Sequence, residues 1–414
     1  MSDYKGIEFL RRQLALKRKR VDLRYRYYEM KNGMVDFGKT TPPEMRALKE
    51  TLGWCAKAVD SIADRLSFRG FHDDVLGMWE IFQLNNPDIL FDSADLSALI
   101  SACCFIYISK NEDGYPLLQV IDGSRATGTS DPITGMLREG YAILDWDKLT
   151  HEPYLEAYFT AGETTYIDRI RQTTETVPNA APYPLLVPIV YRPDETRPFG
   201  RSRISRACMG IMQGALRTLK RSEISAEFYS FPQKYVLGLS QDAEQLDKWQ
   251  ATMSSLLQYD KDEDGDHPVV GQFQQQSMTP FVDQMRMFAS LFAAETGLTT
   301  DDLGFVTDNP SSSESIKASH ENLRLAARKA QKTFGSGFLN AGYLAACVRD
   351  NFAYRRAAVY MTKPLWEPIF EPDMSTLSLI GNGALQINQA VPGYITAETL
   401  RDFGVKGGST ADGD

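Results

Sequence analysis

The sequence has few of the residues from which catalytic and metal sites are usually built. Its four histidines lie far apart and lack the HExxH spacing of a zinc protease. The five cysteines are scattered, odd in number and without a CxxC pair, which argues against a disulfide framework or a zinc site and favours a reducing compartment. There is no GxxxxGK[ST], GxGxxG or GxSxG motif. We therefore expect no enzyme activity, no cofactor and no bound metal.

Long apolar runs and an excess of positive charge are also missing. The longest apolar stretch, residues 96–108, is interrupted and shorter than the roughly 20 residues that cross a bilayer. The N-terminus carries charges where a signal peptide has an apolar core. These features predict that the protein has no membrane partner and that it is assembled inside a cell. The net charge of −9 argues against a freestanding nucleic-acid binder, because Lys and Arg supply sequence-independent affinity for phosphates, but it allows a protein that surrounds DNA.

The first half of the chain changes from helical to strand-like patterns. Helices are predicted over residues 8–31, 43–66 and 73–85. The first has a dense basic surface, which is interpreted either as a contact for an anion or a partner protein, or as a solvated face. Residues 96–190 alternate short apolar runs with turn signals, including a hairpin turn at 111–114. This predicts an α+β fold in which a mostly antiparallel sheet lies on a helical base.

Two long helical patterns enclose a small insert in the second half. The first covers residues 201–230 and would be about 40 Å long at 1.5 Å per residue. The second covers residues 279–296, with Thr279 placed to cap it, Pro280 at the first helical position and Gly297 as a stop signal. The insert, residues 231–278, contains two strand patterns and a short amphipathic helix. If the two helices pack together they run in opposite directions, so the insert lies at one end.

An acidic run within the insert has two interpretations. Asp260, Asp262 and Asp264 match the first half of an EF-hand calcium loop. The twelfth position, where a bidentate Glu closes the calcium shell, is Gly271, and Pro268 interrupts the loop. A solvated acidic turn is the alternative. These carboxylates also support a different class of function, a metal-dependent nuclease or hydrolase.

The last part of the chain is predicted to be mostly helical. Ser311 and Glu314 have the spacing of a capping box, and the helix that they open continues to about residue 352, with Gly335 and Gly337 weakening it. A small helical unit follows at 377–389 and 396–403. The polar tail, residues 407–414, is expected to be disordered.

Four segments together resemble a known family. They are WCAKAVDSIADRLSFRGF (54–71), residues 197–239, residues 295–323 and the helical unit at 385–403; the most specific feature is Asn-Pro-Ser-Ser (309–312), which opens a long helix after a loop that a glycine begins. In these segments the chain resembles the portal proteins, or head-to-tail connectors, of tailed double-stranded DNA phages, in the group typical of long-tailed actinobacteriophages.

The resemblance implies a portal-type α+β fold and a division of the chain into parts. These would be the wing (1–200 and 314–374), two stem helices (201–230 and 279–296), the clip (231–278), the tunnel loop (297–313), the crown (375–406) and a flexible tail (407–414). It also implies a dodecameric ring in the virion, at a unique capsid vertex, that is assembled in the host cytoplasm and conducts DNA during packaging and ejection. The implied partners are double-stranded DNA, the terminase large subunit, the major capsid and scaffolding proteins, and a head completion or adaptor protein.

The resemblance assigns candidate residues to three of these parts. ATP hydrolysis would belong to the terminase, so no catalytic residue is implied. An acidic tunnel loop without Lys or Arg would repel phosphates and keep the duplex centred rather than bound. Stem charges would face the channel or a neighbouring subunit, and the acidic run would contact the motor or adaptor. A cytoplasmic adaptor protein is a further alternative. The residues are Thr299, Thr300, Asp301, Asp302 and Asp308 in the loop; Arg217, Lys220, Arg221, Glu223, Asp283 and Arg286 in the stem; and Asp260, Asp262, Glu263, Asp264 and Asp266 in the clip.

Overall fold

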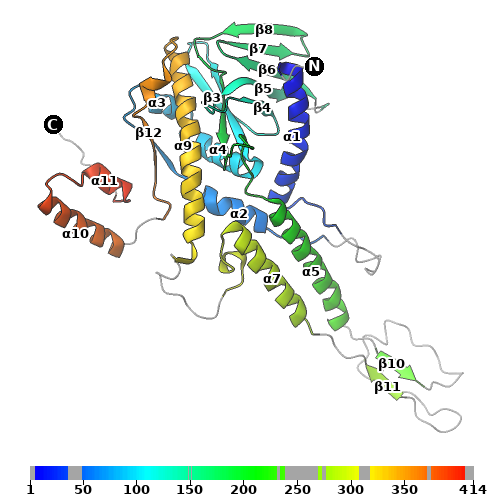
Figure 1. The fold of residues 1–414 in the computed structure, drawn as a ribbon. Helices are drawn as coiled ribbons and strands as arrows, with labels where there is room; N and C mark the ends of the chain where they lie inside the picture. The colour runs from blue at the N-terminus through cyan, green and yellow to red at the C-terminus, as the bar shows by residue number, and fades with distance from the viewer. Residues whose placement is uncertain are drawn as a thin grey trace, which may run out of the picture.

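The fold consists of a body of helices and antiparallel sheets from which a pair of helices extends (Figure 1). The computed structural model describes residues 5–35, 49–147, 149–150, 152–230, 234–237, 269–272, 277–306, 318–370 and 374–405. The predicted α+β class with antiparallel pairing is confirmed. Among the described residues, no helix combines the length and the apolar character that a bilayer span requires.

The N-terminal part of the body is helical, as predicted, but with different bounds. Residues 49–53 are not helical, so the second predicted helix is shorter than expected; it begins after Gly53, a poor helix former. The third spans six residues and begins only at Met78, where Asp74 accepts hydrogen bonds from the backbone N–H groups of Met78 and Trp79. The elements are α1 (Ile7–Tyr28), α2 (Trp54–Ala63), β1 (Phe68–His72), α3 (Met78–Gln83) and α4 (Pro87–Ser101).

Two antiparallel sheets follow in the chain. One has the strand order β3-β2-β9, and the other is a five-stranded meander in the order β4-β5-β6-β7-β8. The predicted hairpin turn at 111–114 connects β2 to β3. The strands are β2 (Cys103–Lys110), β3 (Pro116–Ile121), β4 (Ala126–Ser130), β5 (Leu137–Trp146), β6 (Pro153–Thr160), β7 (Glu163–Asp168), β8 (Thr173–Pro178) and β9 (Leu186–Val190).

The two extending helices are α5 (Arg206–Ser230) and α7 (Thr279–Thr296). α5 begins five residues later than predicted, because the Ser205 hydroxyl accepts a hydrogen bond from the Cys208 N–H and caps the helix there. α7 has the predicted bounds, but its N-cap is Met278 rather than Thr279. Gly297 ends α7 in the left-handed conformation, with φ at 70°, as expected of a glycine stop. β10 (Lys234–Leu237) and β11 (Val269–Gln272) pair at the far end of this hairpin.

A long buried helix, α9 (Glu321–Arg349), crosses the body. His320 is its N-cap, so the helix predicted to run unbroken from Ser311 is interrupted there; Ser311 itself lies outside the described residues. The prediction that Gly335 and Gly337 weaken the helix is wrong. Both are buried at close contacts, since a Cβ on Gly337 would lie 2.5 Å from Ile189 and one on Gly335 would lie 2.8 Å from Pro364.

The C-terminal elements complete the fold. A 3-10 turn, η3 (Arg356–Val359), leads to β12 (Lys363–Trp366), which pairs antiparallel with β1. Two helices, α10 (Met374–Ala390) and α11 (Ala397–Asp402), form the expected small helical unit. Thr396 caps α11, as predicted, by accepting a hydrogen bond from the Thr399 N–H.

Candidate functional site

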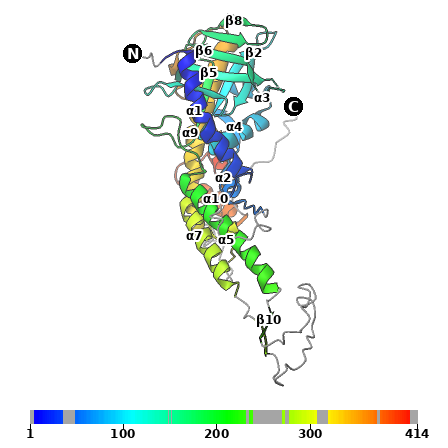
Figure 2. The same ribbon diagram turned by 90° about the vertical axis from the view of Figure 1, so that its right-hand side faces the viewer.

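The α5–α7 hairpin is the feature that distinguishes this molecule from a compact globular domain. The two helices lie side by side in both views and point away from the body (Figures 1 and 2). β10 pairs antiparallel with β11, from Lys234 opposite Gln272 to Leu237 opposite Val269. The described strands of the insert therefore lie at the tip, as antiparallel helices require.

Close packing joins the two helices. Phe281, Met285, Phe288 and Phe292 have the spacing of an apolar stripe on one face of α7. The first three are half-buried, and Phe292 is fully buried. A Cβ on Gly214 of α5 would lie 2.7 Å from the Phe288 ring, so a glycine is what allows the helices to approach here. The Thr218 hydroxyl also donates a hydrogen bond of 3.0 Å to the Gln284 side-chain oxygen.

The buried face of α5 differs from the one that apolar spacing in the sequence predicts. That spacing predicts a stripe of Ile204, Cys208, Ile211, Ala215 and Leu219. Ile211 and Leu219 are only half-buried, whereas Met212 and Leu216 are buried. Lys220 continues this buried row and is 5% exposed, because it follows Leu216 by one helical turn. Little of its side chain is therefore available to a channel or a neighbouring subunit.

The other predicted stem residues are more accessible. Arg217 is half-buried, and Arg221, Glu223, Asp283 and Arg286 are exposed on the surface of the hairpin. Exposed apolar side chains accompany them on α7, where Val282, Met287 and Leu291 are 45–50% exposed. The hairpin thus presents a mixed apolar and charged surface to its surroundings.

A buried arginine fixes the base of the hairpin to the body. Arg203 Nε donates a 3.0 Å hydrogen bond to the carbonyl oxygen of Ala58 in α2, and its terminal nitrogen donates to the carbonyl of Thr296 at the end of α7. Burial lowers the pKa of this guanidinium. One side chain that precedes α5 therefore joins α2, α5 and α7. Sequence reasoning did not identify it, because nothing distinguishes Arg203 from nearby surface arginines in the sequence.

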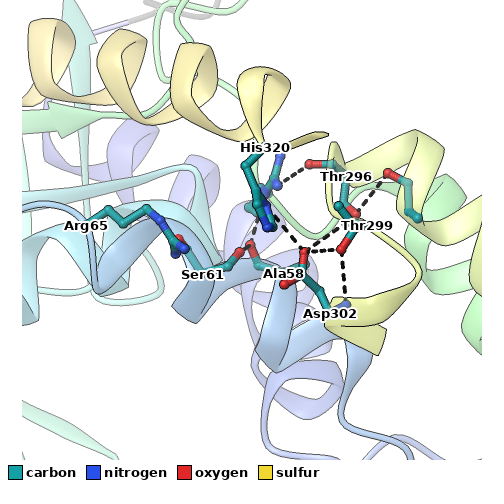
Figure 3. Close-up of polar contacts among 9 residues, drawn as sticks. Ala58, Ser61, Arg65, Thr296, Thr299, Asp302 and His320 are labelled. Carbon is teal, nitrogen blue, oxygen red and sulfur yellow. Dashed lines mark hydrogen bonds and ion pairs between the residues drawn. The ribbon is translucent and has the colours of Figure 1, made fainter. Parts of the chain in front are cut away.

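The segment after α7 is organised by local hydrogen bonds (Figure 3). The Thr299 N–H and hydroxyl both donate to one oxygen of Asp302, at 2.9 Å, and the Asp302 N–H donates to the Thr299 hydroxyl. His320 Nδ1 lies 3.7 Å from the same carboxylate oxygen. Asp302 is thus engaged inside the segment, whereas Asp301 is exposed and Thr300 half-exposed. Asp308 lies outside the described residues.

Contacts around His320 connect this segment to the rest of the body. The His320 ring lies 6.5 Å from the Phe370 ring, and the Arg65 guanidinium lies 5.4 Å from the centre of that same ring. Arg65 also donates to the Ser61 carbonyl oxygen in α2 (Figure 3). The start of the predicted tunnel loop, α2 and the chain that leads to α10 therefore meet at one place.

The remaining sequence candidates concern metal ions. The acidic residues Asp260, Asp262, Glu263, Asp264 and Asp266 lie outside the described residues. Within the described part of the chain, no three His, Cys, Asp or Glu side chains are grouped in a way that could hold a metal ion.

Sequence reasoning also missed a basic groove. It lies between α1, β4 and residues 192–206, with a volume of about 1200 Å³. Its signal in the sequence was the basic surface of the first helix, for which a contact with an anion or a partner was one of two interpretations.

The chain is similar to two curated proteins. It is 26% identical over 344 residues to the portal protein of Mycobacterium phage L5, covering 76% of this chain and 68% of the relative. It is also 26% identical over 345 residues to the portal protein of Mycobacterium phage D29, covering 77% of this chain and 69% of the relative. No family model matches the sequence.

Solved structures align with it more distantly. A chain from the virion of a native gene transfer agent particle covers 85% of this chain and 90% of its own, with a TM-score of 0.45 and 12% identity. A chain from the neck of such a particle, computed with C12 symmetry, covers 84% and 88%, with a TM-score of 0.45 and 14% identity. The curated relatives confirm the resemblance that the sequence motifs indicated: this chain is similar to the portal proteins of actinobacteriophages.

Proposed function

We propose that the chain is the subunit of a dodecameric portal ring, which occupies one vertex of a phage capsid and conducts DNA during packaging and ejection. The observation that carries the proposal is the α5–α7 hairpin, which projects from the body with a small β-hairpin at its tip (Figure 1). Copies of such a hairpin, arranged around an axis, enclose a passage. The similarity to two phage portal proteins over about three quarters of the chain supports the same function.

The parts of the ring follow from this arrangement. α5 and α7 form the stem, and the insert between them forms the clip that contacts the terminase motor and later the head completion protein. The body forms the wing, which contacts the capsid and scaffolding proteins, and α10 with α11 forms the crown. Residues 297–313 form the tunnel loop.

The loop acts on DNA by repulsion rather than by binding. Its described acidic residue Asp301 is exposed, while Asp302 is held by Thr299. A ring of exposed carboxylates keeps phosphates away from the wall of the channel. Cations at the same place would instead bind the phosphates of the duplex at each position that it passes through. Exposed stem charges such as Arg221 and Asp283 pair across subunits.

Negative-stain imaging of the purified protein, together with native mass measurement, tests the proposal. We expect closed rings with a central opening, and a mass that corresponds to many subunits. Labelling of assembled particles with a site-specific tag on the chain should mark one vertex of each. A protein that remains monomeric or dimeric both in solution and within particles contradicts the proposal and favours the adaptor hypothesis.

A further inference from the structure

The basic groove concentrates positive charge in an otherwise acidic protein. Among the described residues that line it, eight are Lys or Arg and one, Glu295, is acidic. The whole chain has a net charge of −9, so this is a strong local departure from its average. A groove with this lining attracts anionic groups.

The cations form a half-buried floor and an exposed rim. On the floor, Lys17 lies 4.8 Å from the centre of the Phe105 ring and Arg24 donates a 2.8 Å hydrogen bond to the Ser101 carbonyl oxygen. Three further arginines form what we call the basic rim, Arg20, Arg197 and Arg206. All three are exposed, and none forms an ion pair with any residue that the structure describes. As far as the described part of the chain shows, the rim can therefore bind an external anion.

The positive charges repel each other in the isolated subunit. Burial lowers the pKa of Arg24, and the charges of Arg20 and Arg197 lower it further. An anionic group at the rim would relieve this repulsion. The fold thus leaves an electrostatic imbalance that a partner can correct.

A local excess of negative charge exists elsewhere in the body. Asp88 and Asp92 lie one turn apart on α4, and Asp64 is the C-cap of α2; together we call them the acidic patch. All three are exposed. Burial raises the pKa of Asp92, and the charges of Asp88 and Asp64 raise it further. The acidic patch would likewise be stabilised by an external cation.

α4 separates the two charged surfaces. It begins four residues after α3 and ends at Ser101, which receives the hydrogen bond from Arg24 of α1. Asp92 precedes Ser101 by nine residues, which is about 14 Å along a helix. In Figure 1, α3 and α1 lie on opposite sides of the body with α4 between them. Asp88 and Asp92, on the turns of α4 that follow α3, and the basic rim, beside the other end of α4 where Ser101 contacts α1, therefore mark two flanks of one subunit.

A closed ring requires such a pair of flanks. Rings form through heterologous contacts, in which one surface of each copy meets a different surface of the next. We propose that the acidic patch of one copy docks against the basic rim of its neighbour. This inference rests on the proposed ring and names the surfaces that close it. Charge complementarity between the flanks favours a second copy of this chain over DNA as the occupant of the rim.

Charge reversal tests the inference with full-length protein. One variant carries Arg20→Glu, Arg197→Glu and Arg206→Glu, and a second carries Asp64→Arg, Asp88→Arg and Asp92→Arg. Each should give at least about tenfold fewer rings in negative stain than the unchanged protein, because like charges would then face each other. A mixture of the two variants should form rings again, since each reversed rim then meets a reversed patch. A single chain that carries all six changes should do the same.

A matched control separates this effect from a general loss of charge. Arg12→Glu, Lys19→Glu and Arg26→Glu reverse three exposed cations on α1 that do not line the groove, and should leave ring formation unchanged. Circular dichroism should show the same fold for all variants. If the rim variant still forms rings, or if neither the mixture nor the six-change chain restores them, the inference is wrong although the ring itself stands. Loss of binding to a duplex DNA probe by a rim variant that still forms rings would assign the groove to DNA instead. Absence of rings in the unchanged protein, both in solution and within particles, would overturn the proposed function.

Discussion

α9 and α7 are both amphipathic helices, yet they bury their apolar residues to different extents. Of the 29 residues of α9, 17 are buried within the subunit. α7 has 18 residues, of which four are buried, all in its last eight positions next to the body. α9 thus gains its stability from its own chain. The outer part of the hairpin leaves apolar surface exposed, as expected of an element that is completed by other molecules.

The largest expected effect contrasts an aromatic residue of α9 with one of α7. Phe338 is fully buried among Phe68, Phe91 and Trp366, with ring centres 4.7–6.1 Å apart. Phe338→Ala should lower the free energy of unfolding of the isolated subunit by about 3–5 kcal/mol, measured by urea titration. Phe288→Ala, at a half-buried position of the hairpin, should cost less than half as much. Equal losses of unfolding free energy in the two variants would contradict the difference in burial between α9 and α7.

The next effect concerns the joint between the two regions. Arg203→Met keeps the apolar part of the side chain but removes two buried hydrogen bonds, to the carbonyl oxygens of Ala58 and Thr296, which should cost about 3 kcal/mol. The Ala58 oxygen keeps the hydrogen bond that it accepts from the Ser61 hydroxyl. Arg201→Met is the control, since its ion pair with Asp194 is exposed and should contribute less than about 1 kcal/mol. Hydrogen exchange should show faster opening at the end of α7 in the Arg203 variant. Unchanged exchange there would show that Arg203 does not fix the hairpin.

A smaller effect on stability is expected when two glycines of α5 are replaced by alanine, and its sign should differ between them. A Cβ on Gly214 meets the Phe288 ring, whereas one on Gly210 meets nothing within 4 Å. Gly214→Ala should destabilise the subunit by about 1–3 kcal/mol, since the helices must move apart or the ring must shift. Gly210→Ala should stabilise it by about 0.5–1 kcal/mol through helix propensity. Thermal unfolding of both variants measures the difference, and a shift of the same sign in both would contradict the packing described above.

The smallest expected effect is at the exposed face of α7. Leu291 is 50% exposed, so Leu291→Gln should change the free energy of unfolding of the isolated subunit by no more than about 0.5 kcal/mol. Leu344→Gln, at a fully buried position of α9, serves as the comparison and should be severely destabilising. A large loss of monomer stability in the Leu291 variant would mean that the hairpin is completed within its own chain.

Some elements could be predicted closely because their signals are local. α7 has the predicted bounds because Pro280 and Gly297 mark its two ends, and Thr396 caps α11 through its own side chain. α4 was missed, since Asn-Asn-Pro at residues 85–87 reads as a turn and the helix buries residues on several sides. β8 was missed because all six of its residues are exposed, and only its pairing with β7 makes it a strand.

The candidate residues show the same difference between properties that depend on local sequence and properties that depend on packing. Arg221, Glu223, Asp283 and Arg286, which the resemblance assigned to the channel or to a neighbouring subunit, are exposed on the hairpin. The burial of Lys220, assigned in the same way, depends on which face of α5 meets its neighbours. The engagement of Asp302 by Thr299 is local, yet its place beside His320 depends on how α9 packs. The contacts of Arg203 and the basic groove could not be predicted, because the residues that form them come from distant segments of the chain.

The sequence by itself determined the α+β class, the ends of α7 and the position of a small insert between two helices, because capping residues, glycines and apolar spacing act over a few neighbours. Only the tertiary structure decided which faces are buried, where α9 tolerates its glycines and how cations from α1 and from residues 192–206 gather in one groove. These properties depend on contacts between residues that lie from about thirty to more than a hundred positions apart, and the local sequence pattern of a segment does not show which distant segment it will contact.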